Sequence, residues 1–349
     1  MVFGGILVTI WIIIYTLSAA LLSAALTGRV RALAVRHGVM DLPNARSSHS
    51  APTPRGGGVA IVLCVTFGLV TLVLLGRLDA DLFFALSGGG LAVAAIGFLD
   101  DRRPLSARTR LVVHTLAAVW ALLWLGGLPP IRLGGQLIAF GWAGYPLGAL
   151  AIIWVLNLFN FMDGIDGIAA SEALFIALGG ALLSGALGLP GGLVLTLALF
   201  GAACLGFLTW NWPPARIFMG DVGSGYLGYF IAVIALVSGR YNSVGLPVYL
   251  ILGGLFFADA TVTFLRRLVR RDPVHLPHRS HAYQWLARRW HSHQRVTVTV
   301  ALVNVLALLP AAYAAIVFPA FAGWILALAL AVLVLAAGIA GAGRKENQV

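Results

Sequence analysis

The stretch Asn157-Leu-Phe-Asn160-Phe-Met-Asp163-Gly-Ile-Asp166-Gly167 decides how this sequence is understood. It separates two apolar segments, 137–156 and 168–187, and each is long enough to cross a lipid bilayer as a helix. Acidic side chains are costly beside hydrocarbon and are seldom kept there without a task. Only twelve Asp and Glu residues occur in all 349 positions. The stretch therefore predicts a membrane protein that keeps its reactive groups in short polar gaps.

The composition supports a membrane protein. Hydrophobic residues make up 60% of the chain and charged residues 10%, whereas soluble domains average about 25% charged residues. The mean hydropathy is +0.95. A window of roughly 19 residues predicts an all-α integral membrane protein in which residues 1–349 form one multi-pass domain. The eleven expected spans are 3–26, 57–75, 82–99, 111–128, 137–156, 168–187, 193–210, 223–237, 246–265, 296–317 and 320–340.

The distribution of basic residues predicts the orientation. The polar gaps between the predicted spans alternate between the two sides of the membrane. Of the 23 Lys and Arg residues, twenty fall in the gaps of one side or in the tail, and three fall in the gaps of the other side. Because basic loops stay in the cytoplasm, we expect the N-terminus outside and the C-terminus inside. The net charge of +11 then reflects topology, and we expect no nucleic-acid partner. The cytoplasmic loops would be 27–56, 100–110, 157–167, 211–222 and 266–295.

The outer gaps are short and poor in reactive residues. A transporter needs polar groups near the middle of the membrane or on both faces, so this asymmetry favours an enzyme, with a transporter of a phosphorylated solute as the alternative.

Residues 1–26 lack a basic start and a cleavage site, which predicts a retained first span. Cys64 and Cys204 fall within spans, and we expect them to be packing residues.

Two of the five inner motifs precede the stretch quoted above. The first runs from Asp41 through Asn44, Arg46 and His49 to Arg55, and the glycines at 56–58 follow it. Its backbone N–H groups could meet an anion, although a plain connecting loop would also carry such arginines.

The second motif contains Asp100 and Asp101 at the end of a span, followed by four arginines. Adjacent carboxylates repel each other unless a cation or arginines neutralise them. The alternative is an ordinary helix end whose surface ion pairs contribute little to stability.

The third motif repeats polar residues at every third position: Asn157, Asn160, Asp163 and Asp166. If helical, they would lie along one side. The fourth contains Arg216 and the turn Gly220-Asp221-Val-Gly223-Ser224, which leads into a span. This turn predicts Asp221 and free N–H groups at a helix N-terminus, a favourable place for phosphate, although an ordinary Asp N-cap would look the same.

The fifth motif is His275-Leu-Pro277-His278-Arg279-Ser280-His281-Ala-Tyr-Gln284. Zinc is a rival ligand, but no cysteine contributes to this motif and its spacing fits no common zinc pattern. His and Arg at this density suit a pyrophosphate. We expect His291 and His293, farther along, to be solvated.

Taken in order, the five motifs resemble those of the polyprenyl-phosphate N-acetylhexosamine-1-phosphate transferases. That family includes phospho-N-acetylmuramoyl-pentapeptide transferase, which starts peptidoglycan lipid intermediates. The resemblance extends from Asp41 to Gln284. Peptidoglycan translocases carry consecutive histidines where this chain has His278-Arg-Ser-His281, so the branch that starts O-antigen or related surface polysaccharides is the closer likeness. A CDP-alcohol phosphotransferase, the enzymatic rival, would concentrate its aspartates in one helical motif.

The resemblance implies transfer of a sugar-1-phosphate from a UDP-N-acetylaminosugar to undecaprenyl phosphate, with release of UMP, in the bacterial inner membrane. It implies Mg²⁺, or Mn²⁺, as cofactor with Asn160 and Asp221 as metal contacts, and it is compatible with a homodimer. The catalytic residues would be Asp100, Asp101, Asp163 and Asp166. The substrate-binding residues would be Asn44, Arg46, His49, Arg55, Asn157, Arg216, His278, Arg279 and His281.

Overall fold

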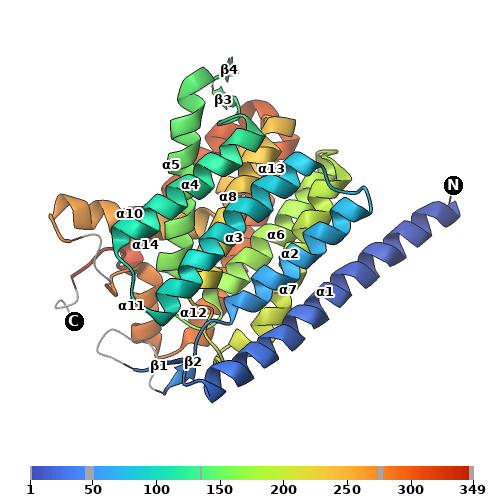
Figure 1. Cartoon of the computed structure of the whole chain (residues 1–349). Coiled ribbons are helices and arrows are strands. Elements are labelled where there is room, and N and C mark those ends of the chain that lie inside the picture. Colours follow the sequence, from blue (N-terminus) through green and yellow to red (C-terminus); the bar gives the residue numbers. More distant parts are fainter. Residues whose placement is uncertain (1, 44–50, 134–135, 274–277, 346–349) are drawn as a thin grey trace.

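The computed structural model describes residues 2–43, 51–133, 136–273 and 278–345 (Figure 1). These residues form a bundle of helices with two small antiparallel hairpins, one pairing β1 (Met40–Asp41) with β2 (Thr53–Pro54) and one pairing β3 (Ile131–Leu133) with β4 (Gln136–Ile138). The helices are α1 (Val2–Arg36), α2 (Gly58–Leu74), α3 (Ala80–Arg102), α4 (Ala107–Leu125), α5 (Gly144–Met162), α6 (Ile168–Ala186), α7 (Gly191–Asn211), α8 (Asp221–Tyr241), α9 (Gly245–Leu252), α10 (Gly254–Val269), α11 (Ala282–Trp290), α12 (His293–Val303), α13 (Leu309–Val317) and α14 (Ala322–Ala340).

The helices confirm an all-α membrane architecture. Within the described ranges, nine helical segments are long and apolar enough to cross a membrane, and the pair α9 and α10, bent by 71°, would make ten. Helix α2 is also apolar but has only 17 residues. Each of the eleven predicted spans contains a helix. The count of eleven and the orientation stay predictions.

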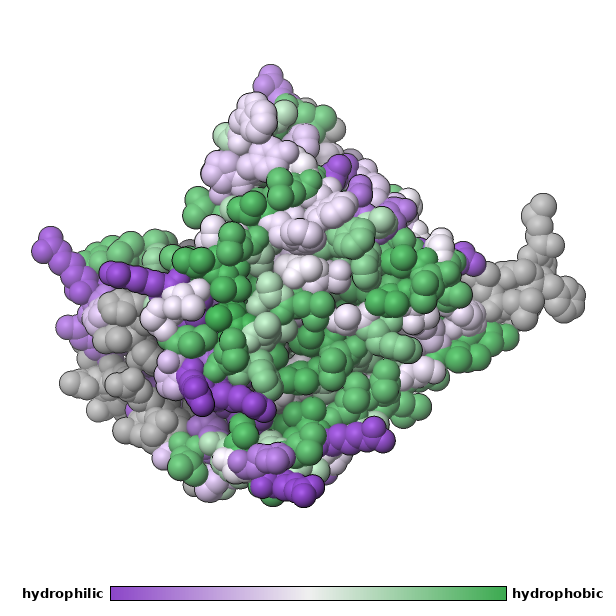
Figure 2. All heavy atoms as spheres, in the orientation of Figure 1, coloured by the Kyte–Doolittle hydropathy of each residue, from purple (hydrophilic) through white to green (hydrophobic). Residues whose placement is uncertain are grey.

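Helix α8 is the centre of the bundle, because its apolar stretch is completely buried by its neighbours. Small residues let helices approach closely in membrane proteins, and a Cβ at Gly228 would stand only 2.6 Å from the carbonyl oxygen of Val155 on α5. The Tyr229 hydroxyl donates to the carbonyl of Ala85 on α3, at 2.6 Å. Outside this core, Figure 2 shows a broad apolar surface in green across the middle of the molecule, with hydrophilic residues in purple along its lower and left edges.

Several helices extend into the segments predicted as loops. Helix α1 continues to Arg36, ten residues beyond the expected span, and α5 continues to Met162. The strip of four polar residues is therefore not one helix: Asn157 and Asn160 lie on α5, whereas Asp163 and Asp166 lie in the loop before α6. The ends that carry the motifs gather on one side of the bundle (Figure 1), because the end of α3 meets the start of α8, the loop after α5 meets the start of α12, and the start of α11 meets the end of α5.

Candidate active site

Three carboxylates and two arginines meet where α3, α4 and α8 come together. Arg55 Nη2 lies 2.7 Å from Asp101 Oδ1 and 3.1 Å from Asp221 Oδ1. Arg110 Nη1, in the first turn of α4, lies 2.8 Å from Asp100 Oδ2 and 3.5 Å from Asp221 Oδ2. The first, second and fourth motifs are thus brought into one cluster, and each arginine contacts two of its carboxylates.

The two adjacent aspartates of α3 have different surroundings. Asp101 is 3% exposed, and its oxygens accept the backbone N–H groups of Asp221 at 2.9 Å and of Val222 at 3.2 Å. It therefore satisfies donors that α8 leaves unpaired at its N-terminus. Asp100 instead accepts the Leu105 N–H at 2.6 Å and the Arg110 guanidinium.

Gly220 makes this arrangement possible. It precedes α8 with φ 76° and ψ 169°, a conformation that favours glycine. A Cβ at Gly220 would overlap the Asp101 carboxylate. The sequence Gly-Asp therefore serves two purposes: the glycine admits the capping carboxylate of α3, and the next residue is left 21% exposed, facing both arginines.

The glycine run of the first motif has a packing role. The N–H groups of Gly57 and Gly58 donate to the carbonyls of Phe218 and Met219, both at 2.9 Å. For Gly57 and Gly58 the expectation of N–H groups free to meet an anion was wrong, because these two groups join the start of α2 to the segment before α8. A Cβ at Gly58 would also collide with Gly223. This close contact holds the preceding Arg55 beside Asp221.

The charge of Arg55 is secured by its partners. Burial by itself would lower the pKa of the guanidinium, but the carboxylates of Asp101 and Asp221 outweigh burial and raise it. Arg55 also keeps a 31% exposed side chain. It lines a polar cavity of about 580 Å³ together with His37, Asp41, Asp101 and Arg102. A phosphate entering this cavity would meet a fixed positive charge next to the carboxylate cluster.

The loop 163–167 adjoins the cluster from the other side. Asp163 follows the last turn of α5, and burial raises the pKa of its carboxyl well above the usual range, with the nearby Asp221 carboxylate raising it further. Asn160, half-buried one turn earlier, accepts the Asp163 N–H at its carbonyl, at 3.4 Å. The Asn157 side chain donates to the Ile153 carbonyl of its own helix at 2.8 Å.

Asp166 is held by the segment after α7 and by α12. Its Oδ2 accepts the Ala215 N–H at 3.0 Å, and its Oδ1 lies 3.3 Å from Nδ1 of His293. The Asn211 side chain accepts the Gly167 N–H at 3.0 Å and donates to the Ile217 carbonyl at 2.9 Å. The third and fourth motifs are therefore joined through buried hydrogen bonds.

The fifth motif is docked on α10 and on the end of α5. Asp259 of α10 accepts the N–H groups of Ala282 at 2.8 Å and Tyr283 at 3.1 Å, which caps α11. The Tyr283 hydroxyl donates to the Phe161 carbonyl at 2.9 Å. His281 is 3% exposed, and its ring stacks on that of His278 with centroids 4.9 Å apart. His281 is thus mostly covered, and His278 is the more accessible of the two.

The surroundings of His278 favour the neutral form of its imidazole. Burial, followed by the proximity of His281 and Arg267, lowers its pKa to about 3. Its Nδ1 lies 2.9 Å from the Ser280 hydroxyl. When that hydroxyl donates, the ring hydrogen resides on Nε2, where His278 could donate to a phosphate oxygen.

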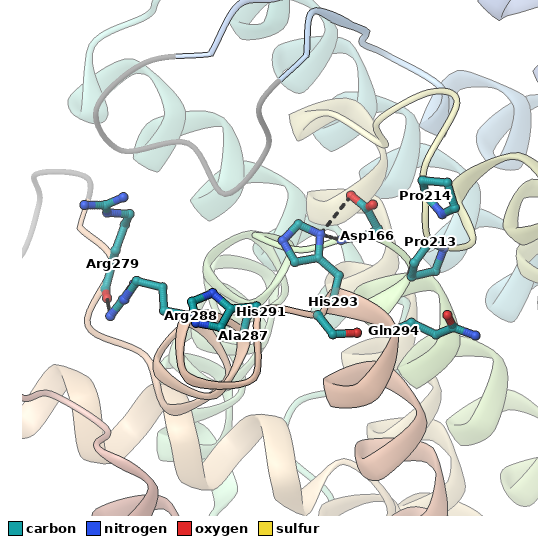
Figure 3. Close-up of a pocket in the computed structure, with 10 residues that line it drawn as sticks. Asp166, Pro213, Pro214, Arg279, Ala287, Arg288, His291, His293 and Gln294 are labelled. Atoms are coloured by element: carbon teal, nitrogen blue, oxygen red, sulfur yellow. Dashed lines mark hydrogen bonds and ion pairs between the residues drawn. The ribbon is translucent and has the colours of Figure 1, made fainter.

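A second polar cavity, of about 530 Å³, opens beside the Asp166–His293 pair (Figure 3). Arg279 lies across it from this pair, and the Arg279 carbonyl accepts the Arg288 guanidinium at 3.0 Å. His291 lines the same cavity with φ 50°. The cavity is therefore bordered by Arg279 of the fifth motif, by Arg288, His291 and His293 from farther along the chain, and by one acid of the third motif, Asp166.

Some predicted residues are not joined to the cluster by the described contacts. Arg216 folds back on its own segment, donating to the Thr209 carbonyl at 3.2 Å and covering the Trp210 ring at 5.0 Å. Asn44, Arg46 and His49 lie outside the described residues. Conversely, Arg110 and His293 were missed as site residues. Arg110 could have been found from its position in the first turn of the helix after Asp100, whereas His293 gave no signal beyond its residue type.

The donor set suits a hard divalent cation completed by substrate. In the part of the chain that the structure describes, no three His, Cys, Asp or Glu side chains form a metal site by themselves. Mg²⁺ is usually bound through one or two carboxylates together with substrate phosphates. The Asp221 carboxylate is accessible, and the half-buried Asp163 lies near it. Burial and the Asp221 carboxylate raise the pKa of Asp163, and a cation beside them would favour the ionised form of both carboxyls.

Comparison with known proteins identifies the class. Residues 83–239 match the profile of glycosyl transferase family 4. A probable undecaprenyl-phosphate N-acetylglucosaminyl 1-phosphate transferase of Bacillus subtilis is 32% identical over 289 residues, covering 80% of this chain and 78% of the relative. A decaprenyl-phosphate N-acetylglucosaminephosphotransferase of Mycobacterium tuberculosis is 30% identical over 320 residues, covering 82% and 78%. A phospho-N-acetylmuramoyl-pentapeptide-transferase of Moorella thermoacetica is 34% identical over 249 residues, covering 64% and 75%.

The chain therefore belongs to glycosyl transferase family 4, as its motifs indicated. It is a multi-pass membrane enzyme of the polyprenyl-phosphate hexosamine-1-phosphate transferase class. The transporter alternative is not supported.

Proposed function

We propose that the enzyme transfers an N-acetylaminosugar-1-phosphate from a UDP-sugar to undecaprenyl phosphate at the cytoplasmic face of the bacterial inner membrane. The products are UMP and a lipid-linked pyrophosphoryl sugar that starts O-antigen or another surface glycan. The observation that carries this proposal is the cluster of Asp100, Asp101, Asp221, Arg55 and Arg110 at the polar end of an apolar bundle. It offers cationic groups for phosphates within reach of a lipid-dissolved acceptor.

The carrier phosphate is the nucleophile in this proposal. A phosphate monoester has a second pKa of about 6. The carrier phosphate is therefore mostly dianionic at neutral pH and needs little help from a base. One of its oxygens attacks the β-phosphorus of the UDP-sugar, and the bond from that phosphorus to the bridging oxygen breaks. UMP departs with the bridging oxygen and the bonding electrons. Phosphoryl transfer of this kind depends mainly on positioning and charge neutralisation.

The contacts of the described residues support a separate role for each side chain of the cluster. Arg55 and Arg110 pair with phosphate oxygens, since a guanidinium is always charged and matches a phosphate in geometry. Asp101 positions Asp221 through the cap of α8. Asp100 orients Arg110 and takes any residual proton from the carrier phosphate. Neutral His278 donates a hydrogen bond to a phosphate, and Asp163 and Asp166 shape the nucleotide side of the site.

Mg²⁺, or Mn²⁺, is the proposed cofactor, with Asp221 and Asn160 as its contacts. When bound, it would neutralise pyrophosphate charge. The remaining predicted contacts, Asn157, Arg279, Arg216 and His281, are proposed to bind substrate; of these, Arg279 has the strongest support because it lines the polar cavity.

The proposal is tested by incubating purified protein with undecaprenyl phosphate, Mg²⁺ and a panel of UDP-sugars. UMP should appear only when both a UDP-N-acetylaminosugar and the lipid phosphate are present. No UMP with any sugar of the panel would contradict the proposed donor. A two-step route through an aspartyl intermediate is the competing mechanism, and a covalent sugar-phosphate enzyme trapped without lipid carrier would establish it.

A further inference from the structure

Two side chains of helix α12 contact the same loop residue. His293, the first residue of α12, places Nδ1 3.3 Å from Asp166 Oδ1. Thr297, four residues later and on the same face of the helix, donates its hydroxyl to the Asp166 carbonyl at 3.0 Å. One helix thus contacts both the side chain and the backbone of Asp166.

The other half of the Asp166 carboxylate is also engaged. Its Oδ2 accepts the Ala215 N–H at 3.0 Å, while Oδ1 faces His293. The Asp166 N–H is farther from Nδ1, at 3.5 Å. We assign the Nδ1 hydrogen to the carboxylate contact, because a ring lone pair facing a carboxylate oxygen would be repelled. Asp166 is then held from two directions by segments far apart in the sequence.

The contact stands at the edge of the 530 Å³ cavity. In Figure 3 the second ring nitrogen of His293 is directed away from Asp166, on the side where Arg279 and Arg288 lie. This volume falls within the range of about 300–1,000 Å³ that is usual for small-molecule sites. Cationic and imidazole side chains around it suit the anionic, water-soluble donor and not an isoprenoid chain.

We propose that His293 is a positioning residue for the UDP-sugar, which fixes Asp166 and with it the loop 163–167 at the nucleotide side of the site. Thr297 acts with it by holding the backbone of the same residue. The proposal rests on the proposed function. It separates the roles of two histidines that are close in sequence: His293 holds the loop, whereas His291 only borders the cavity.

The test compares two substitutions at one position. His293→Ala removes the donor to Asp166, whereas His293→Asn retains an N–H group close to the position of Nδ1. Since a hydrogen bond to a charged group contributes about 1.5–3 kcal/mol, the alanine variant should raise the KM for the UDP-sugar by about tenfold or more. The KM for undecaprenyl phosphate should stay within about twofold of wild type. The asparagine variant should recover most of the loss.

A matched pair on the same helix isolates the Thr297 contact. The Thr299 hydroxyl donates to the Arg295 carbonyl of its own helix at 2.8 Å, whereas the Thr297 hydroxyl crosses to Asp166. Thr297→Val should raise the KM for the UDP-sugar by about threefold to tenfold, in line with the loss of one hydrogen bond. Thr299→Val should leave it unchanged. Thermal unfolding of each variant in detergent confirms that the fold is retained.

The outcomes separate this inference from the proposed function. If wild-type enzyme releases no UMP from any UDP-sugar, the proposed function fails. If wild type is active but His293→Ala leaves the KM for the UDP-sugar within about twofold, the positioning role is overturned. An equal rise in the KM of both substrates, or no recovery in His293→Asn, would also overturn it. Competition by UMP provides a second measurement, and its inhibition constant should rise in parallel with the KM.

Discussion

Asp101 caps the helix that Asp221 begins. The Asp101 carboxylate, on α3, accepts the backbone N–H of Asp221 at 2.9 Å, and the side chain of Asp221 then faces Arg55 and Arg110. One acid is buried and fully engaged in holding the helix, and the other is accessible. The two carboxylates are therefore expected to fail in different ways when they are replaced.

Asp221→Asn should lower kcat by about 10²–10³, a magnitude typical of removing an organised electrostatic group from an active site, while the melting temperature stays near that of wild type. Asp101→Ala should lower the melting temperature as well, because it leaves two N–H groups at the start of α8 without their acceptor, at about 1–3 kcal/mol for a buried polar group. UMP release and thermal unfolding measure both effects. Near-normal turnover in Asp221→Asn would remove this residue from the site.

Gly220→Ala should disturb the Asp101 cap of α8 from the side of α8, because residue 220 directly precedes this helix. The new Cβ would occupy the place of the Asp101 carboxylate, and φ 76° is strained for alanine, which together should cost about 1–3 kcal/mol. Gly185→Ala is the control, since a Cβ at this position of α6 would meet no other atom within 4 Å. It should lower neither stability nor turnover, since alanine is the better helix former. Equal melting temperatures for the two variants would contradict the cap.

Arg110→Met should lower turnover by about tenfold to a hundredfold. It removes the guanidinium that joins Asp100 to Asp221 and that would meet a phosphate. Hydrogen bonds to charged groups contribute about 1.5–3 kcal/mol each. Arg108→Met is the matched control on the same turn of α4, where the side chain is exposed. A comparable loss in both variants would indicate a general effect of positive charge.

Hydropathy and charge were sufficient to predict the helical membrane architecture, because the bilayer imposes a length and an apolar composition on every span. They could not predict where helices continue past the apolar stretch. Helix α1 runs to Arg36 and α5 to Met162, since polar residues are as free to be helical as apolar ones once they leave hydrocarbon. For the same reason the predicted loop 157–167 is partly helical: its first two polar residues lie on α5, and its two aspartates follow the end of that helix.

The five motifs were recognisable from their residue types, but their pairings were not. Nothing in the sequence indicates that Asp101 and not Asp100 would cap α8, since the choice depends on the rotation of α3 about its axis. Asp259 illustrates the same limit: it borders a largely apolar cavity, but its oxygens cap α11, a role that its place in an apolar stretch does not indicate. His293 was expected to be solvated because no neighbour in the sequence marks it, whereas its partner Asp166 is 127 residues away.

The buried pair of Glu172 and Asn304 offers a stability test away from the site. Asn304 donates to Glu172 Oε2 at 2.6 Å, and both residues are almost completely buried. Asn304→Leu should destabilise the protein by about 1–3 kcal/mol, because the Glu172 carboxyl loses its partner. Glu172→Gln should be much milder, since an amide can accept the same hydrogen bond. Thermal unfolding in detergent measures the difference, and equal losses would show that the hydrogen bond is unimportant.

Removal of divalent cations should abolish turnover. Treatment with EDTA should reduce UMP release to background, and Mg²⁺ or Mn²⁺ should restore it, because pyrophosphate charge must be neutralised for transfer. Asp221→Asn should need a higher Mg²⁺ concentration for its residual activity. Full activity in EDTA would contradict the metal assignment of Asp221 and Asn160.

The most direct measurement follows the β-phosphate of the donor. With ³²P in the β-position of UDP-N-acetylglucosamine and undecaprenyl phosphate as acceptor, the label should move into the organic extract as lipid-linked pyrophosphoryl sugar, and UMP should be unlabelled. Asp221→Asn should slow this movement by about 10²–10³. Label that remains in water-soluble UDP while the sugar alone reaches the lipid would contradict phosphosugar transfer at this site.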